Sequence, residues 1–232
     1  MPPSHFQTFG PDHQIVLALT LIGCLLLVRS AVRIRRRPKD LTFRWILILT
    51  LTVSGLMSWS HKLGQGINGL PLELCDLALI AVIGTLIRPE IRYLGEMGVL
   101  WALSGSVQAI LTPDLGEGFP SLSFILFFLT HCGVVVSAVY VMARGHVVLV
   151  PASVLRVWLA TNVYASSVGI LNWRFGSNFG YLAAKPIKPS LLDYLGPWPY
   201  YIFWEEAIAF GLFSLGYGFS RYLESRCVRR SS

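Results

Sequence analysis

Two side chains on separate apolar stretches have the chemical types that nucleophilic catalysis needs, a thiol and an imidazole. Cys75 lies thirteen residues before Arg88, and His131 lies thirteen residues before Arg144. If both stretches are helices, each group lies roughly 20 Å along its axis from its arginine, at about 1.5 Å of rise per residue. A cysteine and a histidine at one height in a bundle can form a pair in which the imidazole accepts the thiol proton. The spacing therefore predicts a Cys75–His131 pair.

A second interpretation of the same two residues is structural. A buried cysteine often behaves as a small inert hydrophobic side chain, and a histidine in an apolar helix can simply bond a serine or a carbonyl. Asp76, next to Cys75, would raise the pKa of the thiol and oppose its reactivity, whereas a proton-accepting His131 would offset that effect. Position alone leaves both interpretations open.

Other polar groups in the apolar stretches lie at a similar height. Counted in residues from the arginine at the end of each stretch, or from His146 for the sixth stretch, they lie roughly 18–24 Å from that end at about 1.5 Å per residue. An ionisable group at the centre of a membrane helix costs about 2.5–3.5 kcal/mol on insertion scales, so such groups usually face the bundle interior. We expect a polar cavity open to the outer side, formed by the third, fifth and seventh helices and lined by Asp76, Gln108, Asn162, Glu205 and Glu206.

Two phenylalanines one turn before the histidine complete the predicted site. Phe127 and Phe128 share the helical face of His131 and would form an apolar wall suited to an acyl chain. Gln108 or Asn162 could donate a hydrogen bond to the oxyanion that forms during acyl transfer. No metal-binding pattern and no cofactor motif is evident, so neither is expected.

The composition places these residues in a membrane. The 232 residues are 54% hydrophobic and only 13% charged, with a mean hydropathy of +0.60, whereas a soluble domain carries about 25% charged residues. Several apolar runs approach the roughly 20 residues that cross a bilayer. We predict an all-α polytopic protein, one domain over 1–232, with seven transmembrane helices at about 13–29, 43–60, 71–87, 93–111, 119–142, 147–171 and 198–219.

The basic residues predict the orientation. The net charge of +7 resides mainly in alternate loops and in the C-terminal tail, which argues for membrane placement and against nucleic-acid binding. By the positive-inside rule, the N-terminus lies outside and the C-terminus in the cytoplasm. The long connection Asn172–Pro197 then lies outside, where it is a candidate cap over the site. Arg156, inside the sixth span, would either extend to the cytoplasmic face or pair with Glu96.

Four stretches of the chain also carry a family resemblance: Leu70–Asp76 (LPLELCD), Ala102–Leu115 (ALSGSVQAILTPDL), Leu126–Gly133 (LFFLTHCG) and Lys185–Tyr200 (KPIKPSLLDYLGPWPY). Together they resemble the YwaF-like integral membrane family, whose animal relative is transmembrane protein 164, described as a cysteine acyltransferase acting on phospholipids. The resemblance runs over nearly the whole chain from the second span onward. It implies a seven-helix fold, with Cys75 matching the nucleophile and His131 its partner.

The favoured function is therefore thiol-dependent transfer or hydrolysis of a lipid acyl ester, with membrane lipids or a lysolipid as partners. The protein would be integral to a membrane, by resemblance the bacterial cytoplasmic (plasma) membrane. A small transporter or lipid-binding protein is the alternative, in which Asp76, Glu205, Glu206 and Arg156 carry protons or ion pairs. A third hypothesis is a structural or assembly partner without turnover.

Overall fold

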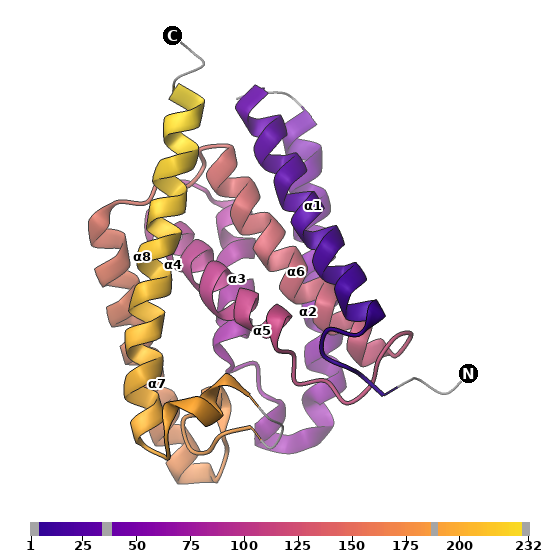
Figure 1. The fold of residues 1–232 in the computed structure, drawn as a ribbon, viewed down its shortest axis with the longest axis vertical. Coiled ribbons are helices and arrows are strands. Elements are labelled where there is room, and N and C mark those ends of the chain that lie inside the picture. The colour runs from indigo at the N-terminus through magenta and orange to yellow at the C-terminus, as the bar shows by residue number, and fades with distance from the viewer. Residues whose placement is uncertain (1–4, 34–38, 187–189, 229–232) are drawn as a thin grey trace.

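A computed structural model describes residues 5–33, 39–186 and 190–228 (Figure 1). These residues form an all-α bundle. Its eight α-helices are α1 (Pro11–Arg33), α2 (Lys39–Lys62), α3 (Leu74–Ile87), α4 (Arg92–Trp101), α5 (Val107–Leu111), α6 (Leu122–Ala143), α7 (Pro151–Phe175) and α8 (Tyr200–Val228). Three short segments are 3₁₀ helices, η1 (Leu63–Gly69), η3 (Phe179–Tyr181) and η4 (Leu191–Leu195), and η2 (Ala102–Ser106) is a π-helical turn.

The prediction of a polytopic helical membrane protein is confirmed. α4, η2 and α5 follow one another as the fourth unit, so the helices make up seven long units, as expected. Within the described residues, six of these units are long and apolar enough to cross a membrane. α8 has 29 residues but does not qualify, and its second turn carries the adjacent charges Glu205 and Glu206. The orientation of the chain in the membrane remains a prediction.

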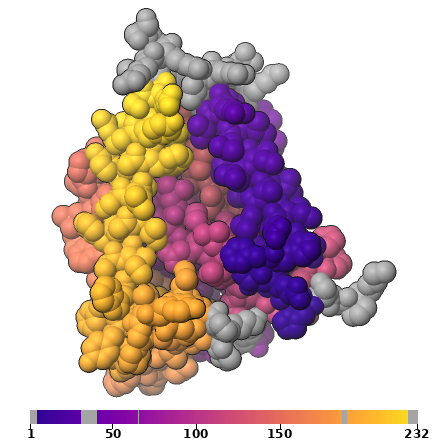
Figure 2. Space-filling model, viewed as in Figure 1, coloured from indigo at the N-terminus to yellow at the C-terminus, as the bar shows by residue number. Residues whose placement is uncertain are grey.

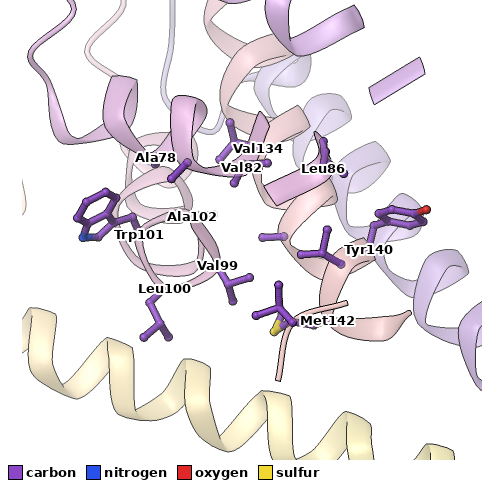
Figure 3. Close-up of a cluster of buried hydrophobic side chains, with 14 of the residues drawn as sticks. Ala78, Val82, Leu86, Val99, Leu100, Trp101, Ala102, Val134, Tyr140 and Met142 are labelled. Carbon is purple, nitrogen blue, oxygen red and sulfur yellow. The ribbon is translucent and has the colours of Figure 1, made fainter. Parts of the chain in front are cut away.

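The core of the bundle lies between α3, the fourth unit and α6 (Figure 3). α3 is apolar on every side, as is typical of a helix enclosed by others. It packs against α4 and α6. Both α1 and α2 also pack against α6, whereas α7 packs against α8 (Figure 1). Gly98 allows α4 to approach α3 closely, because a Cβ there would lie 3.1 Å from backbone atoms of Ala81 and Val82.

The fourth unit contains a π-helical turn that the sequence did not reveal. In η2 the chain adds a residue per turn, and the amide of Val107 donates to the carbonyl of Ala102, five residues earlier. The Ser104 hydroxyl donates to the Leu100 carbonyl at 2.7 Å, and such a bond from a side chain disturbs the regular ladder. η2 contacts α3, α6 and α8, so the irregular turn lies at the centre of the bundle. Single π turns inside α-helices occur frequently at functional sites.

The third helix begins later than expected. Pro71 was predicted to occupy its first position, but α3 begins at Leu74. The Asp76 carboxylate accepts a hydrogen bond from the Glu73 amide at 3.1 Å, which caps the helix one turn beyond the proline. Cys75 is consequently the second residue of α3, in its first turn.

A buried ion cluster joins α4 to α7. Glu96 is 1% exposed and accepts hydrogen bonds from Arg156 at 2.6 and 2.8 Å, from Arg92 at 2.7 Å and from Ser153 at 2.8 Å. Of the two interpretations given above for Arg156, pairing with Glu96 is therefore correct. A buried carboxylate with four charge-assisted or hydroxyl donors is well compensated for its loss of water.

Candidate functional site

Cys75 occupies the first turn of a helix in which backbone donors are available. It is half-buried, and the amides of Asp76 and Leu77 already donate to the Glu73 carbonyl. The Cys75 amide belongs to the first turn, where helical amides have no acceptor one turn earlier. The positive end of the helix dipole lies at this position, but burial and the carboxyl groups of Glu73 and Asp76, which interact electrostatically with Cys75, oppose a thiolate. The Cys75 thiol therefore needs a base before it can act as a nucleophile.

His131 lies in the middle of α6 and is held in one tautomer. Its Nδ1 lies 2.8 Å from the Phe127 carbonyl oxygen, which can only accept a hydrogen bond, so Nδ1 carries the proton. The Phe127 ring stacks on the imidazole, with centroids 4.1 Å apart and planes 26° apart. In the neutral ring, Nε2 then has a free lone pair, and no hydrogen bond to it is recorded from the described residues. This nitrogen can accept a proton.

The two residues have common neighbours. α3 packs on α6, and both Cys75 and His131 interact electrostatically with Asp76 and with Lys62 at the end of α2. Asp76 is fixed by the Trp59 indole N–H, which donates to its Oδ1 at 2.8 Å. A direct contact between the Cys75 sulfur and the His131 imidazole stays a prediction.

Lys62 was not recognised from the sequence. It is half-buried at the end of the second span, and a lysine there is most simply read as a boundary residue in contact with water. Its proximity to Cys75, His131 and Glu73 depends on how η1 folds back toward α3. A cation near the sulfur partly offsets the opposing effects of burial and of the Glu73 and Asp76 carboxyl groups.

Residues 176–199, called the outer cap after the predicted orientation, fold onto the beginning of α3, apart from 187–189, which lie outside the described residues. The Gly180 amide donates to Glu73 Oε2 at 2.9 Å. From α7, the Tyr164 hydroxyl donates to the Leu72 carbonyl at 2.8 Å. The Tyr201 hydroxyl donates to the Tyr181 carbonyl and ties the cap to α8. The long outer connection, predicted as a cap, thus lies beside the residues that flank Cys75.

Tyr181 joins the outer cap to the loop after α5. Its hydroxyl lies 3.3 Å from Asp114 Oδ2 and donates to it. Burial, and then the neighbouring Asp114 carboxylate, raise the pKa of Tyr181 to about 12. The phenol therefore stays protonated and keeps donating over the whole physiological pH range.

Replacing Gly180 by alanine is expected to loosen the outer cap. Gly180 has φ +64°, and a Cβ there would lie 3.3 Å from the Tyr164 hydroxyl, so the substitution strains the backbone and crowds that hydroxyl. We expect a cost of about 1 kcal/mol and faster cleavage of residues 176–199 by added protease. Gly116→Ala is the control, because nothing lies within 4 Å of its added Cβ. Equal cleavage of the two variants would contradict the assigned role of Gly180.

The remaining predicted site residues fall into separate environments. Asn162 on α7 donates to Glu206 on α8 at 2.7 Å and to its own helix at Trp158. Gln108 is exposed on α5. Phe128 is 4% exposed in a cluster with Phe6 and Phe124, so it belongs to the packing of α1 on α6.

The carboxylates that a transporter would need are mostly engaged locally. Asp76 bonds Trp59, Glu206 bonds Asn162, and Glu96 bonds Arg156. Glu205 interacts electrostatically with Glu206 beside it. These contacts lie at three different places in the bundle, which is typical of groups that stabilise helix pairs.

The surface of the bundle has a hollow along its side. Figure 2 shows it between α1 and α8, with the fourth unit as its floor. Two open pockets lie at the ends of the molecule: one of about 350 Å³ beside His5, Phe6 and His13, and one of about 310 Å³ beside Arg92, His146 and Val148. Cys75 and His131 line neither of them. Among the described residues, no group of three His, Cys, Asp or Glu side chains could hold a metal ion.

Comparison with known proteins identifies one family. The model of the TMEM164 family matches residues 8–217. No curated protein and no solved structure matches the chain.

Proposed function

The chain belongs to the TMEM164 family, and from that premise we propose that it transfers or hydrolyses lipid acyl esters with Cys75 as the nucleophile. The observation that carries the proposal is the state of His131. Its protonated Nδ1 is held by Phe127, so Nε2 can act as a base. Its helix packs on the helix whose first turn contains Cys75.

The proposed reaction has two steps. His131 Nε2 takes the thiol proton while the sulfur attacks the ester carbonyl, and the collapse of the tetrahedral intermediate expels an alcohol that takes the proton back from His131. The product is a thioester on Cys75 and a lysolipid. Water or the hydroxyl of an acceptor lipid then attacks the thioester, again with His131 as the base, and Cys75 regains its proton.

The backbone of α3 supplies the best donor for the oxyanion. The Cys75 amide belongs to the same residue as the nucleophile and lies at the positive end of the helix. Of the two side chains predicted for this role, Asn162 has its amide group committed to Glu206 and Trp158. Gln108, on α5, has an exposed side chain and is better placed to meet a lipid.

Trapping the thioester tests this proposal. Purified protein in lipid nanodiscs is incubated with phosphatidylcholine carrying a radiolabelled acyl chain, then quenched in acid. We expect the protein to become labelled. Neutral hydroxylamine, which cleaves thioesters, should release the label, and peptide mapping should assign it to Cys75. Label that resists hydroxylamine, or that maps to another residue, would exclude the proposed intermediate.

The His131→Gln variant separates the roles of the two residues. Glutamine can still bond the Phe127 carbonyl but cannot accept a proton, so we expect thioester formation to slow about 10²–10⁴-fold. Alkylation of Cys75 by a membrane-permeant iodoacetamide at pH 9 should still reach completion, because hydroxide replaces the base. Unchanged thioester formation in this variant would remove His131 from the mechanism.

A further inference from the structure

The space at the basic end of the bundle has the features of an anion site. Its volume is about 310 Å³, and it lies between the beginning of α4, the beginning of α7 and the segment that precedes α7. Its lining consists of Pro89, Glu90, Arg92, Gly95, His146, Val147, Val148 and Val150. We propose that this space, the basic-end cavity, binds a phosphate group, either in a lipid headgroup or as the free ion.

Positive charge exceeds negative charge around the basic-end cavity. Arg92 and Arg156 share the single buried carboxylate of Glu96, so one positive charge of that cluster is not balanced. Glu90 also lines the cavity, and its carboxylate pairs with Arg88 at 3.5 Å. Arg88, Arg92 and Arg156 against Glu90 and Glu96 leave a net charge of +1 around the cavity.

Arg92 keeps donors for a ligand. Its Nε donates to Glu96 at 2.7 Å, which fixes the plane of the guanidinium, and its side chain is 53% exposed. The two terminal nitrogens make no hydrogen bond that the described residues record. A guanidinium held in this way presents paired N–H groups, the geometry that binds phosphate oxygens best.

The backbone adds to this arginine. Both α4 and α7 begin at the cavity, and α4 has no side chain that caps its first turn. The positive ends of two helices thus lie at the same space as Arg92, and each favours an anion. Gly95 allows Val147 to pack against α4 and form part of the cavity wall, because a Cβ at Gly95 would lie 2.7 Å from a Val147 methyl carbon.

The place of the cavity in the membrane suggests the ligand class. Two candidate spans, Arg92–Leu111 and Pro151–Phe175, begin at it. Lipid headgroups lie at the ends of membrane spans, and basic pockets between helices at such a boundary bind anionic headgroups. A volume of about 310 Å³ is large enough for a headgroup phosphate.

Thermal unfolding of the full chain in a non-ionic detergent tests the proposal. Three probes are titrated: dioctanoyl phosphatidylglycerol, inorganic phosphate, and dioctanoylglycerol, which has the same chains without phosphate. We expect saturable stabilisation by phosphatidylglycerol and none by dioctanoylglycerol. Stabilisation by inorganic phosphate at similar concentrations would identify the free ion as the ligand, and its absence would identify the lipid headgroup.

Two variants assign the effect to the cavity. Arg92→Gln should weaken the apparent affinity about tenfold, since one charge-assisted contact is lost. Arg221→Gln is the matched control, because Arg221 also pairs with a glutamate one turn away, at 2.5 Å from Glu224, but lies on α8. Val148→Trp fills the space without changing charge, and Val148 is 51% exposed, so the fold tolerates it. It should also lose the stabilisation.

Three results would overturn the proposal. They are stabilisation by dioctanoylglycerol equal to that by phosphatidylglycerol, equal losses in Arg92→Gln and Arg221→Gln, and full binding in Val148→Trp. Should Arg92→Gln fail to fold, Val148→Trp decides by itself. The outcome does not depend on the acyl-transfer proposal, since no step of that reaction uses this end of the bundle.

Discussion

Cys75→Ser is expected to abolish acyl transfer, with a loss of at least about 10³-fold in the rate of thioester or ester formation. The hydroxyl keeps the size of the thiol, so the fold is preserved. However, a hydroxyl loses its proton much less readily than a thiol, and His131 alone would have to activate it. The measurement is release of radiolabelled fatty acid or lysolipid from phosphatidylcholine in nanodiscs, together with the phospholipid acyl composition of cells that express each variant.

Cys132→Ser serves as the control for this prediction. Cys132 lies next to His131 on α6 and packs against the cluster of Phe6, Ile110 and Phe128. It is therefore a cysteine at the same depth, in the same bundle, with a packing role. We expect wild-type turnover from it. If turnover survives in Cys75→Ser but falls in Cys132→Ser, the nucleophile is Cys132, and the proposed mechanism is wrong.

Glu96→Ala is expected to cost the most stability, about 3 kcal/mol or more. The substitution leaves Arg156 and Ser153 facing an empty position where a carboxylate accepted four hydrogen bonds. Because Arg156 is partly exposed, at 33% of its side chain, water can recover some of that loss. The readout is the free energy of unfolding in mixed micelles as denaturing detergent is increased.

Glu90→Ala provides the matched control for that measurement. Glu90 also pairs with an arginine, at 3.5 Å from Arg88, but both side chains are more than 60% exposed. Exposed pairs contribute about 0–1 kcal/mol, so little change is expected. If Glu96→Ala unfolds no more readily than Glu90→Ala, the buried cluster does not hold α4 to α7.

The two ends of the molecule have different proposed tasks. One end holds Cys75 and the outer cap, where Gly180 and Tyr164 contact the segment that leads into α3. The basic end holds the Glu96 cluster and the basic-end cavity. α4 and η2 run between them and touch α3, α6 and α8. A lipid phosphate bound at the basic end would therefore contact the same helix that packs on the site.

The fold class could be read from the residues alone, because a bilayer demands long apolar helices. Counting about 1.5 Å of rise per residue from Arg88 and from Arg144 also predicts one depth for Cys75 and His131, and this depth stays a prediction. The same reasoning located the outer connection as a cap and identified Arg156 as a possible partner of Glu96.

Only the tertiary structure decided which groups contact one another across the bundle. The depth of a residue does not determine how its helix is rotated or which helices lie beside it. Asn162 and Glu206 are at one depth and do pair, whereas Phe128, one residue from Phe127, turns into the packing of α1 on α6. The start of α3 at Leu74 and the π turn at Ala102–Ser106 depend on local bonds of backbone amides, and the approach of Gly180 to Glu73 depends on a backbone amide from a distant segment. Such bonds leave no period and no motif in a single sequence, since any residue carries the amide or carbonyl that makes them.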